Sequence, residues 1–222
     1  MHAFPPPAAG QHPVRSLRDE AYEIIKARII MCDFRPGEVL SEAAVSAALG
    51  LGRTPVRQAF DRLMRDGLVE VLPRKGVVVR PISQDELAHM VELRLLNETF
   101  CTRLAAERAE PRHLAMLEAN VAAGRRAAEA RDVPTLMALD RGFHTIISTA
   151  AGNPVLGEIL KNLHERAQRF WYVSLRAPEH HNRVVDEHAA ILATLRDHDA
   201  DAAEAAARVH IRSFVENLNR QL

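Results

Sequence analysis

The stretch GRTPVRQAFDRLMRDGLVEVLPRKG, residues 52–76, decides how the first part of this chain folds. Its apolar residues first recur at helical spacing and then gather in a β-branched run before PRKG, and a second such run, residues 77–80, follows directly after it. Thr54-Pro55 offers an N-cap and a first-turn proline, and Gly67 offers a stop, so the pattern predicts a helix between them. The two β-branched runs predict a hairpin whose tip is PRKG.

Two further helical patterns precede this stretch. Ser16 followed by Asp19 is a capping-box start for the first, and Ser41 caps a shorter second pattern that Gly50 ends. Three helices followed by a hairpin describe a winged helix-turn-helix, in which the N-terminal residues of the third helix enter the major groove of DNA. The sequence therefore predicts a winged helix-turn-helix DNA-binding domain over residues 16–80.

Basic side chains gather at the two places where such a domain would meet DNA. Arg53 and Arg57 stand at the start of the third helix, and Arg74, Lys75 and Gly76 form the hairpin tip. A helix N-terminus also favours phosphate, so we expect both groups to belong to one DNA-binding surface. Charge alone does not establish this, because the formal net charge of the chain is +0 and arginines often only solvate a helix face. The order of the elements favours DNA binding.

Composition excludes several other classes of protein. The 222 residues are 47% hydrophobic, which is enough to bury a core. The cysteines, Cys32 and Cys101, are too few for a disulfide framework or a cysteine-based zinc finger, and we expect two buried thiols. No signal-like or membrane-spanning apolar run is present. These features predict a soluble cytoplasmic protein with no membrane segment and a flexible, proline-rich arm at residues 1–15.

After a short linker at 81–83, residues 84–222 are helical in pattern throughout. Helix-breaking or capping residues punctuate the pattern at Pro111, Pro134, Pro154, Pro178 and Asp199. Between them the apolar residues recur three and four apart, which predicts an antiparallel all-α bundle of about six helices. Together with the first domain, the predicted fold class is mainly α.

Polar residues inside these apolar faces indicate a metal site. Asp140 and His144 are four residues apart and so share one helix face, and His188 and His210 occupy apolar positions of two later helices. One carboxylate and three imidazoles suit Zn²⁺ or another divalent ion such as Ni²⁺ or Mn²⁺, with positions left open for water or an anion. Taken singly, a histidine in such a position is more often a satisfied core or surface residue than a metal ligand. Less convincing candidates are His164, without a partner at useful spacing, and His180 and His181, in a loop-like segment.

The first domain also resembles a known family. PGEVLSEAAVSAALGLGRTPVRQAFDRLMRDGLVEVLPRKGVVV, residues 36–79, resembles the N-terminal domain of GntR-family bacterial transcription regulators. The resemblance implies that Arg53, Thr54 and Arg57 contact bases and phosphates, and that Gly76 and its basic neighbours reach an adjacent groove. Three positions depart from the family pattern: Ala43, Gly52 and Gln58.

The second domain is similar to the effector domain of the FadR subfamily of these regulators. The similar segments are LDRGFHTIISTAAGNPVL, EHAAIL and DADAAEAAARVH. The resemblance implies that a metal is held by Asp140, His144, His188 and His210. It also implies that Arg94, in ELRLLNE, binds a carboxylate effector. The residues themselves leave open an i,i+4 ion pair between Arg94 and Glu98 on a solvated face.

The sequence thus predicts a sequence-specific DNA-binding transcription regulator, which we expect to be a repressor. Its operator would be pseudo-palindromic double-stranded DNA, and a small organic acid bound at the metal would modulate operator binding. Homodimerisation is implied by the resemblance and by operator symmetry. One alternative is a purely structural metal site with no effector. Another is a metal-dependent hydrolase, which we do not expect, because Glu187 adjoins His188 and should point away from the ligand face, and no other acid–base partner stands out.

Overall fold

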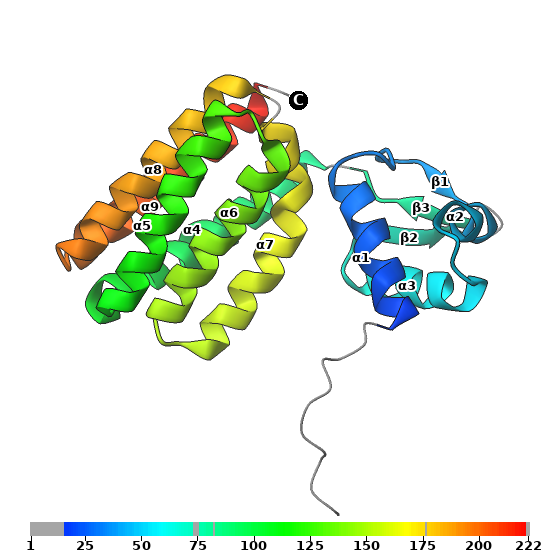
Figure 1. Cartoon of the computed structure of the whole chain (residues 1–222), viewed down its shortest axis with the longest axis horizontal. Coiled ribbons are helices and arrows are strands. Elements are labelled where there is room, and N and C mark those ends of the chain that lie inside the picture. Colours follow the sequence, from blue (N-terminus) through cyan, green and yellow to red (C-terminus); the bar gives the residue numbers. More distant parts are fainter. Residues whose placement is uncertain (1–15, 73–75, 82, 176, 221–222) are drawn as a thin grey trace, which may run out of the picture. The chain divides into compact units, whose positions relative to one another are not determined.

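The computed structural model describes residues 16–72, 76–81, 83–175 and 177–220, and the chain divides after Arg80 into two compact units. Most of the described residues are helical, which confirms the mainly α fold class (Figure 1). Some predicted features lie outside the described residues: the arm at 1–15, Arg74 and Lys75 at the hairpin tip, and residue 82 of the linker at 81–83. None of the helices in the described part combines the length and apolar character that crossing a membrane requires.

The first unit contains the three predicted helices, α1 (Leu17–Ile30), α2 (Glu42–Leu49) and α3 (Arg53–Arg65). The side chains of Ser16 and Ser41 cap α1 and α2 as predicted. Gly50 ends α2 in the left-handed conformation, with φ 64°.

The start of α3 differs from the prediction. Thr54 is not the N-cap, because the helix begins at Arg53, with the extended residue Gly52 in the cap position and no side-chain cap. Proline has no backbone N–H to donate. Because the first N–H groups of a helix have no partner within the helix, starting the helix at Arg53 loses no hydrogen bond at Pro55. Thr54 and Pro55 therefore both lie in the first turn.

A three-stranded antiparallel sheet completes the first unit. The predicted hairpin is present as β2 (Val69–Leu72) and β3 (Gly76–Val79). A third strand, β1 (Val39–Leu40), pairs with β3 and was not predicted. Two residues are too few to show an alternating pattern, so this strand is defined only by its partner far along the chain.

The core of the first unit fixes the orientation of α3. Val56, Ala59, Phe60 and Leu63 bury one face of α3 against α1 and the sheet. The hydroxyl of Tyr22 in α1 donates to the Asp66 carboxylate over 2.7 Å, at the C-terminal end of α3. The opposite face and the N-terminal end of α3 remain exposed.

The second unit consists, in the described residues, of six helices that pack side by side (Figure 1). They are α4 (Gln84–Arg108), α5 (Pro111–Glu129), α6 (Val133–Ala150), α7 (Pro154–Ser174), α8 (Pro178–Arg196) and α9 (Ala200–Asn219). The predicted proline positions lie at the starts of four of these helices. His180 and His181 are in the first turn of α8 and are buried, so their assignment to a loop was wrong.

The two cysteines differ in burial. Cys101 is buried in α4 as predicted, and burial raises the pKa of its thiol to about 12. Cys32 is only partly buried, so that prediction was wrong. Cys32 lies in the turn that follows α1 and has a left-handed conformation, with φ 58°.

Candidate DNA-binding surface and metal centre

The N-terminal end of α3 carries the residues that were predicted to meet DNA. Arg53, Thr54 and Arg57 are all exposed there, and the first turn contains no acidic residue. Since no side chain caps the helix, its positive end is open to an anion such as a DNA phosphate. Gly76 is exposed at the start of β3 with φ 103°, a conformation that L side chains rarely adopt.

The predicted metal ligands come together inside the bundle. Asp140 and His144 extend from α6, His188 from α8 and His210 from α9, and one ligand atom of each lies within 4.8 Å of the others. The nearest Asp140 oxygen, Oδ1, is 3.7 Å from His144 Nε2 and 3.5 Å from His188 Nε2. The three imidazoles are buried, and His188 also stacks on Phe143 with 3.9 Å between ring centroids.

These ligand atoms have the chemistry that a divalent metal needs. Asp140 Oδ1, His144 Nε2 and His188 Nε2 are buried and make no hydrogen bond within the described residues. An unsatisfied buried polar atom costs about 1–3 kcal/mol, so three at one point call for a partner. Burial holds the pKa values of His144 and His188 well below their usual range and raises the pKa of Asp140 to about 6. Both imidazoles are therefore neutral near pH 7, which is the form that binds metals.

A second cluster of charged residues adjoins the four ligands. The Arg94 guanidinium donates from Nε to Glu98 Oε1 over 2.5 Å, and Glu98 also lies 3.0 Å from His164 Nε2 and 3.5 Å from His144 Nδ1. The ion pair between Arg94 and Glu98 thus exists, but it is buried and not solvated. Burial alone would raise the pKa of Glu98, but Arg94 and the two histidines outweigh it and hold that pKa well below its usual value.

Three residues near the centre were not found from the sequence. Glu98 has the i,i+4 spacing of an ordinary surface pair, and His164 has a partner after all, but on a different helix. Glu187 was expected to point away from the ligands, and this was wrong. Its carboxylate Oε2 lies 2.9 Å from Nδ1 of His210, because the side of α8 next to His188 packs against α9.

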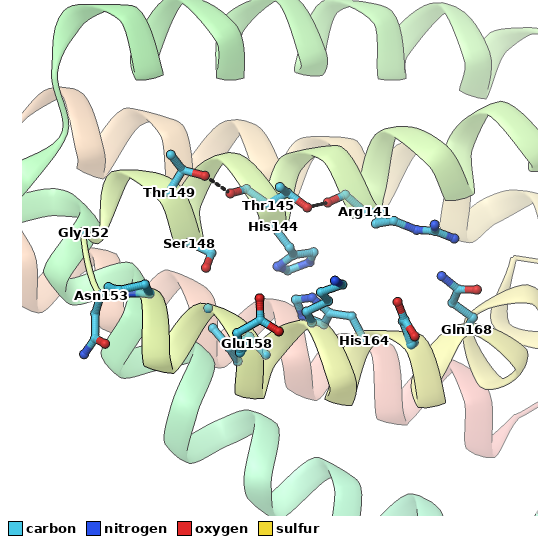
Figure 2. A pocket seen from close by; sticks show the side chains of 15 residues that line it. Arg141, His144, Thr145, Ser148, Thr149, Gly152, Asn153, Glu158, His164 and Gln168 are labelled. Atoms are coloured by element: carbon cyan, nitrogen blue, oxygen red, sulfur yellow. Dashed lines mark hydrogen bonds between the residues drawn. The ribbon is translucent and has the colours of Figure 1, made fainter. Parts of the chain in front are cut away.

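A cavity of about 690 Å³ lies between α6 and α7 and reaches this centre (Figure 2). Its lining includes Arg141, His144, Ser148, Lys161, His164 and Gln168. A much smaller cavity of about 30 Å³ adjoins Asp140 and Arg94. Arg141, His164 and Gln168 line both cavities and so stand between the larger space and Asp140.

A winged helix-turn-helix followed by a helical bundle that buries a cluster of histidine and carboxylate side chains is the arrangement of a class of DNA-binding regulators. Residues 17–79 match the family described as bacterial regulatory proteins, gntR family, and residues 89–213 match the FCD domain. The chain belongs to the GntR family of bacterial regulatory proteins and carries an FCD domain. It is therefore a DNA-binding transcription regulator and not an enzyme.

Individual relatives agree with this assignment. The chain is 27% identical over 209 residues to the HTH-type transcriptional repressor RspR of Escherichia coli (strain K12), covering 94% of this chain and 92% of that protein. It is 28% identical over 223 residues to the HTH-type transcriptional repressor NanR of Edwardsiella tarda (strain FL6-60), and the match covers 89% of this chain and 82% of NanR. The structure of E. coli McbR/YncC has the same fold, with a TM-score of 0.81 at 22% identity. The match covers 93% of this chain and 98% of the McbR/YncC chain.

Replacing Arg57 with alanine should weaken binding to an operator-like DNA by about 1–3 kcal/mol, because the change would remove the charged DNA contact expected of this exposed residue near the N-terminal end of α3. The DNA can be selected from a random pool with the wild-type protein, and affinity measured by gel-shift titration. Arg65→Ala is a matched control, since Arg65 is an exposed arginine at the other end of α3. Equal losses in the two variants would contradict the proposed orientation of α3 on DNA.

Proposed function

We propose that the bundle of this regulator binds a divalent metal, for which Zn²⁺ is the best fit, together with a small organic acid that modulates operator binding. The observation that carries the proposal is the meeting of Asp140 Oδ1, His144 Nε2 and His188 Nε2 at one buried point, where none has a hydrogen bond within the described residues. Asp140, His144, His188 and His210 would hold the ion. A bound metal would supply positive charge and open coordination positions for an acid.

The larger cavity gives an acid a path to this centre. It runs between α6 and α7 up to His144 and His164, and Arg141 and Lys161 add positive charge to its walls (Figure 2). Arg94 lines the smaller cavity beside Asp140, so a carboxylate near the metal would meet the Arg94 guanidinium. Glu98 already engages two nitrogens of Arg94, so the acid would share this arginine with Glu98.

Regulation would follow from a shift between two arrangements of the bundle. An acid that binds one arrangement better favours it, and the linker at 81–83 passes the change to the DNA-binding domain. RspR and NanR are named as repressors, and we propose that this chain also represses. It would act in the cytoplasm on a pseudo-palindromic operator.

A two-fold operator requires a dimer, and the bundle offers a surface for one. Large apolar side chains are exposed on two helices that pack against each other: Leu93, Leu96 and Phe100 on α4, and Val155 and Ile159 on α7. Leu96 and Val155 are 70% and 71% exposed. Monomeric proteins rarely expose many large apolar side chains together, so we propose that these two helices form the homodimer interface.

Zinc should stabilise the folded protein. At 100 times its dissociation constant, Zn²⁺ should add about 2.7 kcal/mol to the free energy of unfolding, and a chelator should reverse the effect. His188→Ala should lose most of this gain, whereas His89→Ala, which removes an exposed histidine of α4, should keep it. Thermal denaturation with and without zinc measures the gain. An unchanged gain in His188→Ala would contradict the proposed ligand set.

The same assay separates an acid sensor from a purely structural metal site. Small mono- and dicarboxylates and sugar acids are added to the zinc-loaded and to the chelated protein. An acid that raises the melting temperature only in the presence of zinc supports the sensor. A zinc-stabilised protein that responds to none of these acids supports the structural site, although the cavity that reaches His144 favours the sensor.

Leu96→Glu should convert the dimer to a monomer, because it places a charge within the proposed interface, at one of its most exposed apolar residues. Light scattering coupled to size-exclusion chromatography measures the mass. Met116→Glu is the control, since Met116 is a comparably exposed apolar residue of α5, at 53%. Retention of the dimer mass by Leu96→Glu would place the interface elsewhere.

A further inference from the structure

Glu187 stands directly behind one of the proposed metal ligands. It precedes His188 in α8, and its Oε2 lies 2.9 Å from Nδ1 of His210 in α9. The His210 side chain is 2% exposed and that of Glu187 is 13% exposed, so the contact is shielded from water. The proposed metal function assigns no role to Glu187.

The hydrogen bond at one imidazole nitrogen determines the state of the other. A neutral histidine carries its proton on either Nδ1 or Nε2, and a carboxylate at Nδ1 favours the form in which Nδ1 is protonated and donates. Nε2 then keeps its lone pair. With Nδ1 engaged by Glu187, Nε2 is the nitrogen of His210 that remains for a metal shared with Asp140, His144 and His188.

We infer that Glu187 is a positioning residue for this metal centre: its carboxylate accepts a hydrogen bond from the Nδ1–H of His210, holds the ring in place and leaves Nε2 free to bind the ion. The inference rests on the proposed metal function. A carboxylate behind a ligating histidine orients the ring and makes it a better donor, and removing such a partner typically weakens metal binding by about 10- to 100-fold.

Glu187 offers a cleaner test than the similar contact at His144. Glu98 Oε2 lies 3.5 Å from His144 Nδ1, but Glu98 is also the partner of buried Arg94 and lies beside His164. Replacing Glu98 would leave the Arg94 charge buried without its carboxylate, which would destabilise the bundle whatever happens at the metal. Replacement of Glu187 leaves the pair between Arg94 and Glu98 intact.

The variants are Glu187→Ala, which removes the acceptor, and Glu187→Gln, which keeps its size but removes its charge. Asp186→Asn is the matched control, since it neutralises the adjacent residue, which is exposed and pairs with Arg125. Competition with a chromophoric chelator measures the zinc dissociation constant. We expect zinc binding to weaken by about 10- to 100-fold in Glu187→Ala and by a smaller factor in Glu187→Gln. Asp186→Asn should bind zinc like the wild type.

A second measurement separates positioning from a merely structural tie between α8 and α9. Long-range proton–nitrogen NMR spectra of the zinc-free protein report which nitrogen of His210 is protonated. We expect the Nδ1-protonated form in the wild type and its partial loss in Glu187→Ala. If Glu187 only ties α8 to α9, Glu187→Ala should have a lower melting temperature. Its zinc dissociation constant and the preferred tautomer of its His210 should then be the same as in the Asp186→Asn control.

The outcomes distinguish this inference from the metal proposal on which it rests. If the wild-type chain binds zinc and Glu187→Ala binds it equally well, the role of Glu187 is overturned and the metal centre stands. An Nε2-protonated His210 in the zinc-free wild type would overturn the role of Glu187 in the same way. If the wild-type chain binds no zinc, the metal centre and this inference are both wrong.

Discussion

Burying Asp140 among the imidazoles of His144, His188 and His210 is the constraint on which the second unit depends. Polar ligand atoms removed from water without a partner oppose folding, and here three of them meet at one point among α6, α8 and α9. The surrounding residues hold this arrangement in place. Phe143 stacks on the His188 ring, Glu187 contacts His210, and Glu98 lies beside His144 while paired with Arg94. A divalent ion would turn this unfavourable cluster into a stabilising one, so binding and folding of the bundle would be linked.

The DNA-binding unit depends on a different constraint, the amphipathic pattern of α3. Its apolar face fills a core that belongs to the first unit alone, and this fixes which end of the helix is exposed. Arg53 and Arg57 can therefore be presented to DNA whatever the bundle binds. Under the proposed function, control by an acid would act on how two such units are held together in a dimer, because a two-fold operator accepts only a limited range of half-site spacings.

Local sequence patterns predicted the helices well, since caps and prolines act within one turn. Ser16, Ser41 and the proline-led starts of the bundle helices lie where expected, and the start of α3 was displaced only because Gly52 can serve as a cap. The sequence did not predict features that depend on contacts between residues far apart in the chain. The strand β1 exists through its pairing with β3, and Glu98, His164 and Glu187 join the site through contacts with other helices. The spacing of Asp140 and His144 was visible in the sequence, whereas their approach to His188 and His210 is a product of packing.

The most direct test of the account is the DNA affinity of the zinc-loaded protein, measured by fluorescence anisotropy with a selected operator while an acid that binds the protein is added. If the metal centre controls DNA binding, the acid should change the dissociation constant for DNA by about 5- to 150-fold, the range of typical allosteric coupling, and a chelator should abolish the change. An acid that binds the zinc-loaded bundle without altering DNA affinity, or that alters it equally after chelation, would contradict metal-dependent control.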